Sequence, residues 1–358
     1  MIITNFQQLN SIGFTNVFNL QFFLRSCKIG DQGAAILGQE ISKRINLLSL
    51  SMDISENFLC DIGTKNLAFE ICKLKNITTL NLNLSFNQIS DDGIVALSQQ
   101  IALFPKLNSL TLNLSNNTFT YNGAFMLEQS ISNSKNLTFL SLNFGKNQIG
   151  KNFSAHQKQK FGQFIGNLTH LTQLFVYLNQ NDIQADQAAV FCSEIAKCNS
   201  LKTLSLDFSG NHIGPDGAHG IGYELSKLIN LNFLNLYLSD NQIGTQGAQK
   251  FAPEIAKLKN LVTIQLDLSN NKIGDDGTQI IGFETVKLQN IHSLTLSLVE
   301  NQISDLGASR LGKEISKCQN LTSLNLELQK NNFGDIGTYG LSQKHLQLKK
   351  LVLYSFRK

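Results

Sequence analysis

The sequence predicts an α/β solenoid in which short parallel strands line a concave face and helices cover a convex face. Two observations carry this prediction. An asparagine recurs every thirty residues, from Asn57 to Asn147 and again from Asn181 to Asn331. Each asparagine follows a run of alternating leucines and precedes a stretch with helical spacing. A fixed period of this size is typical of a chain built from stacked copies of one unit.

Each copy begins with a predicted strand. In the copy that contains Asn241, Leu234, Leu236 and Leu238 alternate with polar residues, as in a strand with one buried face. Asn241 comes where the strand must turn. A buried amide at this point can bond the backbone groups that the turn frees, so we expect a ladder of asparagines from copy to copy.

The second half of each copy is a predicted helix on the convex side. Gly247 provides a tight entry, and Ala248, Phe251 and Ile255 follow at helical spacing. In six copies an aspartate stands two residues before this glycine, as Asp275 does, and is predicted to be the N-cap of its own helix. In one copy a proline falls inside the helix, where we expect it to kink or shorten that helix.

The phrase L-x-x-L-x-L-x-L-x-x-N resembles the leucine-rich repeat, and the long helical half with its glycine resembles the ribonuclease-inhibitor-like subfamily. The resemblance extends from Val17 to Phe356 and implies a horseshoe. We expect a cap over residues 1–16 and, over 17–358, a single domain of eleven repeats with a truncated last strand. The usual family phrase has one leucine pair fewer, so the two extra residues predict a longer strand or a bulge.

Composition excludes several classes of function. The net charge of +4 on 358 residues is too small to indicate nucleic-acid binding. No signal peptide and no apolar run of membrane-spanning length is present, so we expect no membrane partner. The six cysteines form no CxxC pair and predict buried thiols, which favours a cytoplasmic chain.

No catalytic motif is recognisable. The six histidines are scattered over different repeat phases, and there is no HExxH, no Gly-x-Ser-x-Gly and no phosphate-binding loop. The aspartate pairs at the helix starts favour turns and caps over metal ligands. We therefore expect no enzyme activity of its own, no cofactor and no metal.

The concave face offers the first candidate site. The residue between the last two inward leucines is a neutral amide in most early copies, whereas later copies alternate tyrosine and aspartate. Tyrosines flanked by carboxylates are typical of a protein-binding surface that takes a basic segment. The alternative is ordinary polar filling of a sheet face. The predicted partner-binding residues are Phe175, Tyr177, Asp207, Tyr237, Asp240, Asp267, Glu300 and Glu327.

The convex face offers the second candidate site. Seven copies carry a glutamate followed three residues later by a lysine, both predicted to point away from the core as a solvated surface. The pair is missing in three successive copies, and the last of these is four residues longer. Either the insertion extends a helix by about one turn, or the interruption is a binding patch. The patch would comprise Leu103, Asn133, Lys151, Lys158 and Lys160.

Taken together, these features predict a non-catalytic scaffold that binds a protein partner through its concave face. The resemblance implies two alternatives. One is a GTPase-activating protein of the Ran GTPase activator type. The other is a structural subunit of a larger cytoskeletal or ciliary assembly, which would place the chain there instead of free in the cytoplasm.

Overall fold

The computed structural model describes residues 2–4, 17–151, 161–345, 348, 350 and 352–357. Internal contacts divide the chain into two compact units. The first unit comprises Met1–Ser154 and Phe161–Asn181, and the second comprises Ala155–Lys160 and Asp182–Lys358. The cap predicted over residues 1–16 lies largely outside the described residues, and the single domain stays a prediction.

The strands of each unit pair in sequence order, and all pairs are parallel. Their register follows the repeat, so that Leu50 lies beside Leu80 and Leu234 beside Ile264. The strands of the first unit are β1 (Ile2–Ile3), β2 (Asn19–Phe23), β3 (Ser49–Asp53), β4 (Thr79–Asn83), β5 (Ser109–Asn113), β6 (Phe139–Asn143) and β7 (Gln173–Tyr177). Those of the second are β8 (Thr203–Asp207), β9 (Phe233–Tyr237), β10 (Thr263–Asp267), β11 (Ser293–Ser297), β12 (Ser323–Glu327) and β13 (Leu353–Arg357).

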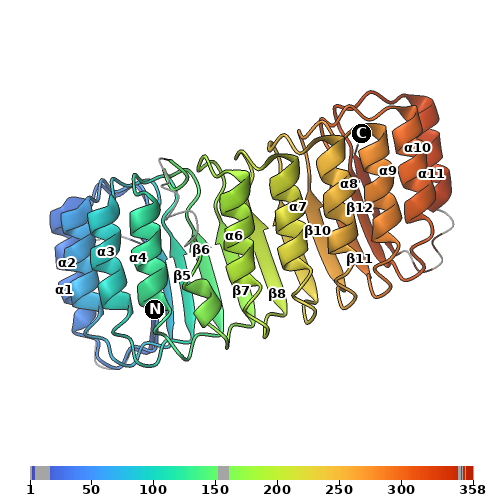
Figure 1. Cartoon of the computed structure of the whole chain (residues 1–358). Coiled ribbons are helices and arrows are strands. Elements are labelled where there is room, and N and C mark those ends of the chain that lie inside the picture. Colours follow the sequence, from blue (N-terminus) through green and yellow to red (C-terminus); the bar gives the residue numbers. More distant parts are fainter. Residues whose placement is uncertain are drawn as a thin grey trace. The chain divides into compact units, whose positions relative to one another are not determined.

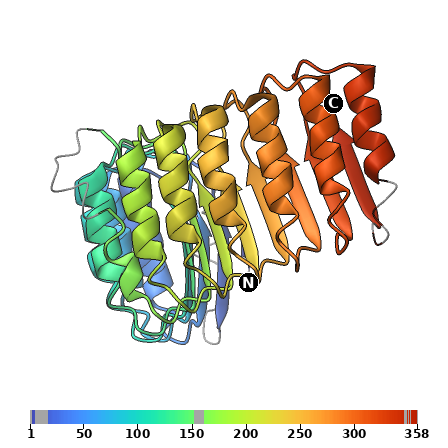
Figure 2. The same ribbon diagram turned by 45° about the vertical axis from the view of Figure 1, so that its right-hand side comes forward.

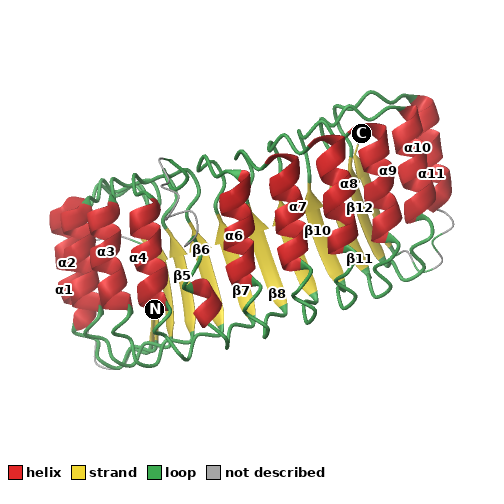
Figure 3. Cartoon of the chain, viewed as in Figure 1, coloured by secondary structure: helices red, strands yellow, loops and turns green. Residues whose placement is uncertain are grey.

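Within each unit the helices lie side by side on one face of the strands (Figures 1, 2 and 3), as the predicted α/β solenoid requires. The first unit contains α1 (Gly30–Ser42), α2 (Asp61–Ile71), α3 (Asp91–Ile101), α4 (Tyr121–Ile131) and the 3-10 helix η2 (Ile165–Asn167). The second contains α6 (Ala185–Ile195), α7 (Gly214–Leu225), α8 (Gly244–Ile255), α9 (Gly274–Thr285), α10 (Asp305–Ile315) and α11 (Asp335–His345). The fold class is confirmed.

The two extra residues of each copy extend the backbone pairing beyond the regular strand. The strand β9 has five residues, and the next core side chain, Leu238, is buried just past its end. There the Leu238 N–H donates to the Asp267 carbonyl at 2.8 Å and the Asp240 N–H to the Ser269 carbonyl at 2.9 Å. The chain then turns at Asp240, where φ is 55°.

The predicted asparagine ladder is present in both units. The Asn57 N–H donates to Asn87 Oδ1 at 3.0 Å, and the Asn241 N–H donates to Asn271 Oδ1 at 3.0 Å. The side-chain nitrogen of Asn271 reaches back and donates to the Leu238 carbonyl at 2.8 Å. Each buried amide therefore joins its own turn to the turn of the preceding copy.

A second asparagine ladder lies at the opposite end of the strands, where each helix leads into the next strand. Asn76 Nδ2 donates to the Ile45 carbonyl at 3.1 Å, and Asn260 Nδ2 donates to the Ile229 carbonyl at 2.7 Å. Sequence analysis missed this ladder, although its asparagines also recur at thirty-residue intervals in most copies.

The aspartates at the helix starts cap the following helix instead of their own. Asp61 is the first residue of α2, and its Oδ1 accepts from Ser90 N at 2.8 Å and Gly93 N at 3.0 Å at the start of α3. The prediction of capping within one copy is wrong because stacking brings the carboxylate against the next copy. Gly93 is required for room, since a Cβ there would lie 2.4 Å from Asp61 Oδ1.

All seven predicted Glu–Lys pairs form, with Nζ–Oε distances of 2.5 to 2.7 Å. The lysine side chains are 46% to 63% exposed, whereas the glutamate side chains are only 9% to 20% exposed. The prediction that both residues point away from the core is therefore wrong for the glutamates. Glu254 packs beside Gly222 of the preceding helix. A Cβ added at Gly222 would lie only 3.1 Å from the Cβ of Glu254.

Two smaller predictions need correction. Pro253 lies inside α8, which has 12 residues like α7, so the proline does not shorten its helix, and the kink stays a prediction. The cysteines, all within the described residues, form no disulfide, but Cys27 is exposed and Cys60 is half-buried, so buried thiols are found only at the other four. Burial raises the pKa of Cys198 and of Cys318 to about 12.

Candidate functional site

The last residues of β8 to β12 form a row on the strand face that the helices leave uncovered, the open face. These residues, the acidic row, are Asp207, Tyr237, Asp267, Ser297 and Glu327. Strand register places each of them beside the next. Ser297 is buried and the other four are half-buried, so the row presents part of its charged and aromatic surface to solvent.

The aspartates of the row also stabilise the turn that follows each strand. Asp207 Oδ1 accepts from the N–H two residues ahead at 2.8 Å, and Asp267 Oδ1 accepts the equivalent bond at 2.9 Å. In the first unit, Asn83 Oδ1 accepts the same bond at 3.2 Å and Asn113 Oδ1 at 3.1 Å. A neutral amide therefore builds this turn as a carboxylate does.

The charge at Asp207 is opposed by its surroundings. Burial raises the pKa of the Asp207 carboxyl, and the negative charge of Asp267 raises it further, against hydrogen bonds from Ser209 that lower it. The surroundings of Asp207 thus disfavour its ionised form. An asparagine at this position would accept the same turn hydrogen bond without a charge. The fold itself does not account for the negative charge at this position.

Two aromatic side chains of β9 share the open face with the carboxylates. Tyr237 stands between Asp207 and Asp267 in the row. Phe233, four residues earlier on the same face, is 46% exposed. Sequence analysis missed Phe233, although the first strand position holds serine or threonine in most other copies of this unit.

The remaining predicted acidic residues differ in whether their carboxylates are paired with a basic side chain. Asp240 is exposed, and its Oδ1 accepts from Asn270 Nδ2 at 3.2 Å. Glu300 is paired with Lys330 at 2.5 Å, which neutralises its charge locally. Glu327 Oε1 lies 3.9 Å from a guanidinium nitrogen of Arg357, the last residue of β13.

The predicted residues Phe175 and Tyr177 lie in the first unit, on β7. Both are half-buried on the open face. The ring of Phe175 contacts the ring of Phe139 on β6, with centroids 5.4 Å apart. Sequence analysis missed Phe139, which lies at the same strand position as Phe233.

On the helix side, Leu103, Asn133 and Lys151 are exposed, as a binding patch requires. The other two predicted patch residues, Lys158 and Lys160, lie outside the described residues, as does most of the insertion that was expected to extend a helix. In the described part of this copy, residues 161–181, the only helical segment is η2.

An aromatic cluster covers α4 on the side of the copy that contains the insertion. The ring of Phe125 lies 5.1 Å from that of Phe164, and the ring of Tyr121 lies 6.3 Å from that of Phe161. Glu128 is buried on the same helix. Burial and the charge of Glu128 raise the pKa of the Tyr121 hydroxyl.

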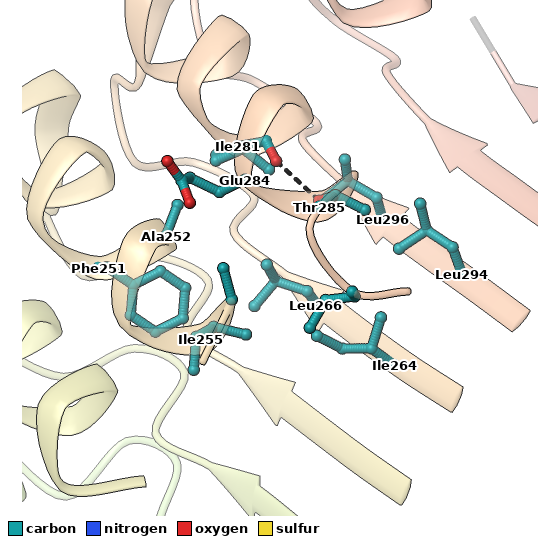
Figure 4. Close-up of a pocket in the computed structure, with 12 residues that line it drawn as sticks. Phe251, Ala252, Ile255, Ile264, Leu266, Ile281, Glu284, Thr285, Leu294 and Leu296 are labelled. Atoms are coloured by element: carbon teal, nitrogen blue, oxygen red, sulfur yellow. Dashed lines mark hydrogen bonds between the residues drawn. The ribbon is translucent and has the colours of Figure 1, made fainter. Parts of the chain in front are cut away.

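A cavity of about 20 Å³ lies between α8, α9 and the strands beneath them (Figure 4). Its lining includes Phe251, Ile255 and Thr285. Thr285 stands where the neighbouring helices carry Ile255 and Ile315, and its Oγ1 donates to the Ile281 carbonyl at 2.7 Å. This cavity is a packing defect rather than a ligand site, because it has room for about one water molecule.

The described ranges contain neither a metal-binding cluster nor a membrane-spanning helix. Within residues 2–4, 17–151, 161–345, 348, 350 and 352–357, no three His, Cys, Asp or Glu residues are grouped so as to hold a metal ion. In the same part of the chain, no helix has the length and apolar character that crossing a membrane requires.

Comparison with known proteins adds to this geometry. A sequence model described as Leucine Rich repeat matches residues 76–98, 106–127, 197–222, 230–252 and 263–279. No curated protein matches the sequence. Among solved structures, the chain resembles an internalin (inlF) of Listeria monocytogenes str. 4b F2365, with 20% identity, a TM-score of 0.44, and coverage of 89% of this chain and 83% of that chain.

It also resembles a chain in the structure of the Rad7 and Elc1 complex in yeast, with 18% identity and a TM-score of 0.50. That match covers 90% of this chain and 72% of the other. The ribonuclease-inhibitor-like subtype stays a prediction. Family repeats in both units, together with parallel strands and a helix in almost every copy, make this chain a leucine-rich-repeat protein.

Proposed function

We propose that this protein is a non-catalytic interaction scaffold. The open face of the second unit binds a protein partner, and the acidic row contacts a basic segment of that partner. The proposed contacts outside the row are Asp240 and the exposed ring of Phe233.

One observation carries this proposal. Asn83 and Asn113 build the same turn as Asp207 and Asp267, so the turn needs an acceptor but no charge. At Asp207 the environment even disfavours the charge, because burial raises the pKa of the carboxyl. A charge that the fold does not need supports a role outside the fold, and carboxylates beside tyrosine favour a cationic partner.

The fold is compatible with this role. Stacked repeats present an extended face with many side chains in fixed register. A protein of the same fold, Rad7, is described in a complex with Elc1.

The test is partner capture followed by a charge-neutralising variant. The full chain captures partners from a lysate, and mass spectrometry identifies them. Binding of the purified partner is then compared between wild type and the double variant Asp207→Asn/Asp267→Asn. We expect roughly tenfold or greater weakening, because each substitution removes charge while keeping the turn acceptor.

Asp53→Asn is the matched control. Asp53 ends β3 and accepts the same turn bond from Ser55 N at 3.1 Å, but it lies in the first unit. This variant should bind the partner as wild type does. Wild-type affinity of the double variant would contradict the proposal.

The same purification separates the two alternatives. If the captured protein is a GTPase and its hydrolysis is stimulated, the chain is an activator instead of a scaffold. If the chain stays with a large cytoskeletal or ciliary assembly at high salt, it is a structural subunit.

We propose the helix-side patch of Leu103, Asn133 and Lys151 as a second contact surface. Its exposure and the loss of the Glu–Lys pair in these copies support this role. The double variant Ser130→Glu/Asn133→Lys restores the repeat pattern there. An unchanged affinity for every captured partner would remove this surface from the proposal.

A further inference from the structure

We infer that the acidic row of the second unit accepts an extended basic segment in the polyproline II conformation, with arginine or lysine at every third position. This inference rests on the proposed function and specifies the kind of segment that the row binds.

The carboxylates of the acidic row recur at a regular spacing. Asp207, Asp267 and Glu327 end β8, β10 and β12, so one strand separates each from the next. Adjacent strands lie about 4.8 Å apart, and the carboxylates therefore recur about every 9.6 Å along the row.

A polyproline II segment that runs along the row has nearly the same period. A polyproline II helix rises about 3.1 Å per residue with three residues per turn, so every third side chain lies on one face at intervals of about 9.3 Å. A β-strand fits less well, because its third-neighbour side chains point to opposite faces. The carboxylate spacing matches the polyproline II repeat.

Between the carboxylates the row holds one aromatic and one small residue. Tyr237 lies between Asp207 and Asp267, and an aromatic ring is the surface on which polyproline II segments dock. Between Asp267 and Glu327 the row holds the small, buried Ser297.

The polar side chains beside the row favour an extended segment over a helical one. An α-helix could also match the carboxylates, because seven residues span about 10.5 Å. However, polar side chains, including Asn235 and Gln265, lie directly below the row and are half-buried. They can bond the open backbone of an extended segment, whereas the backbone groups of a helix are already paired.

The chain itself shows how such a carboxylate receives a basic side chain. Arg357 follows Glu327 in the register of β12 and β13, and its guanidinium lies 3.9 Å from the Glu327 carboxylate. A basic side chain of the partner would form the same kind of ion pair with Asp207 or Asp267.

The experiment measures binding of three fluorescent peptides to the full chain by anisotropy. The first has arginines separated by pairs of prolines. The second has the same number of arginines separated by single prolines, and the third is alanine-rich and helical with arginine at every seventh position. We expect the first to bind at least about tenfold more tightly than the other two. Its affinity should fall by about tenfold or more in Asp207→Asn/Asp267→Asn and stay unchanged in Asp53→Asn.

Several outcomes overturn the inference. Equal affinities, or tightest binding of the helical peptide, contradict the spacing argument but leave the proposed function standing if the double variant still loses the captured partner. Failure of all three peptides to bind also overturns the inference. If the double variant keeps the captured partner, the proposed function fails independently.

Discussion

The two units build the same turn at the end of each strand with different residues. In the first unit Asn83 and Asn113 accept the turn hydrogen bonds, and in the second Asp207 and Asp267 accept them. The hydrogen-bond geometry is nearly the same, but the second unit carries a carboxylate at the ends of β8, β10 and β12, whereas among the ends of β2 to β7 the first unit carries one only at Asp53. Comparison of the two units thus separates what the repeat needs, an acceptor, from what one region adds, a charged surface.

Removal of the buried asparagine ladder, which both units share, should cause the largest loss of stability. Asn117 and Asn271 are buried ladder residues, and each donates to three backbone carbonyls and accepts from at least one backbone N–H. We expect alanine at either position to lower the free energy of unfolding by about 3 kcal/mol or more, because several buried backbone groups lose their partner. Urea denaturation measures this loss.

Asn76→Ala is the control for this prediction. Asn76 belongs to the other asparagine ladder and makes two exposed bonds, one to the Ile45 carbonyl and one from Lys106 Nζ, so its loss should cost no more than about 1 kcal/mol. A large cost at Asn271 with none at Asn117 would show that the units do not depend on the same ladder.

The period of the sequence allowed prediction of the main elements within one copy. Strands, helices, the turn asparagine and the Glu–Lys pairs follow from the period and from local spacing. The contacts that were missed join neighbouring copies. Asp61 caps the helix of the next copy, and Glu254 packs against Gly222 of the preceding one. Such contacts depend on how closely adjacent helices stack, which no spacing within a copy reveals.

The same limit applies to the candidate site. The period assigned the carboxylates to one row, because register follows from the repeat. It could not show that Lys330 neutralises Glu300, or that burial of Asp207 disfavours its charge. Both depend on how far side chains reach between copies.

Capping between copies should have the next largest effect. Asp61 Oδ1 accepts from Ser90 N and Gly93 N, and Oδ2 accepts from Ser90 Oγ at 2.6 Å. We expect Asp61→Ala to lower the free energy of unfolding by about 2 kcal/mol. Asp92→Ala removes an exposed carboxylate from the first turn of α3 and should cost less than about 1 kcal/mol. Equal losses in thermal or urea unfolding would contradict capping by Asp61.

The cavity of the second unit offers a gain in stability. Thr285 occupies the helix position at which the first unit carries Ile71, Ile101 and Ile131. Thr285→Ile fills the cavity of about 20 Å³ and should raise the free energy of unfolding by about 1 kcal/mol. Thr278→Ile is the matched control: Thr278 is fully buried and does not line the cavity, so added volume there should destabilise the fold. A loss of stability in Thr285→Ile would show that the threonine hydroxyl matters more than the missing methylene.

The smallest expected effect tests the comparison of the two units most directly. Asp207→Asn converts a strand end of the second unit into the form found in the first. Because burial raises the pKa of Asp207 in the folded chain, its protonated form stabilises the fold below the unfolded-state pKa, and that contribution is lost as pH rises through the folded-state pKa. Near neutral pH the variant should therefore be more stable than wild type by less than about 1 kcal/mol, and the difference should shrink as the pH falls toward 3. The free energy of unfolding of the variant and of wild type, measured across this pH range, tests this expectation. Asp53→Asn is the control, because it also removes a carboxylate that makes the same turn bond. A variant less stable than wild type at neutral pH would mean that the turn needs the charge, and the separation of acceptor from charge would not hold.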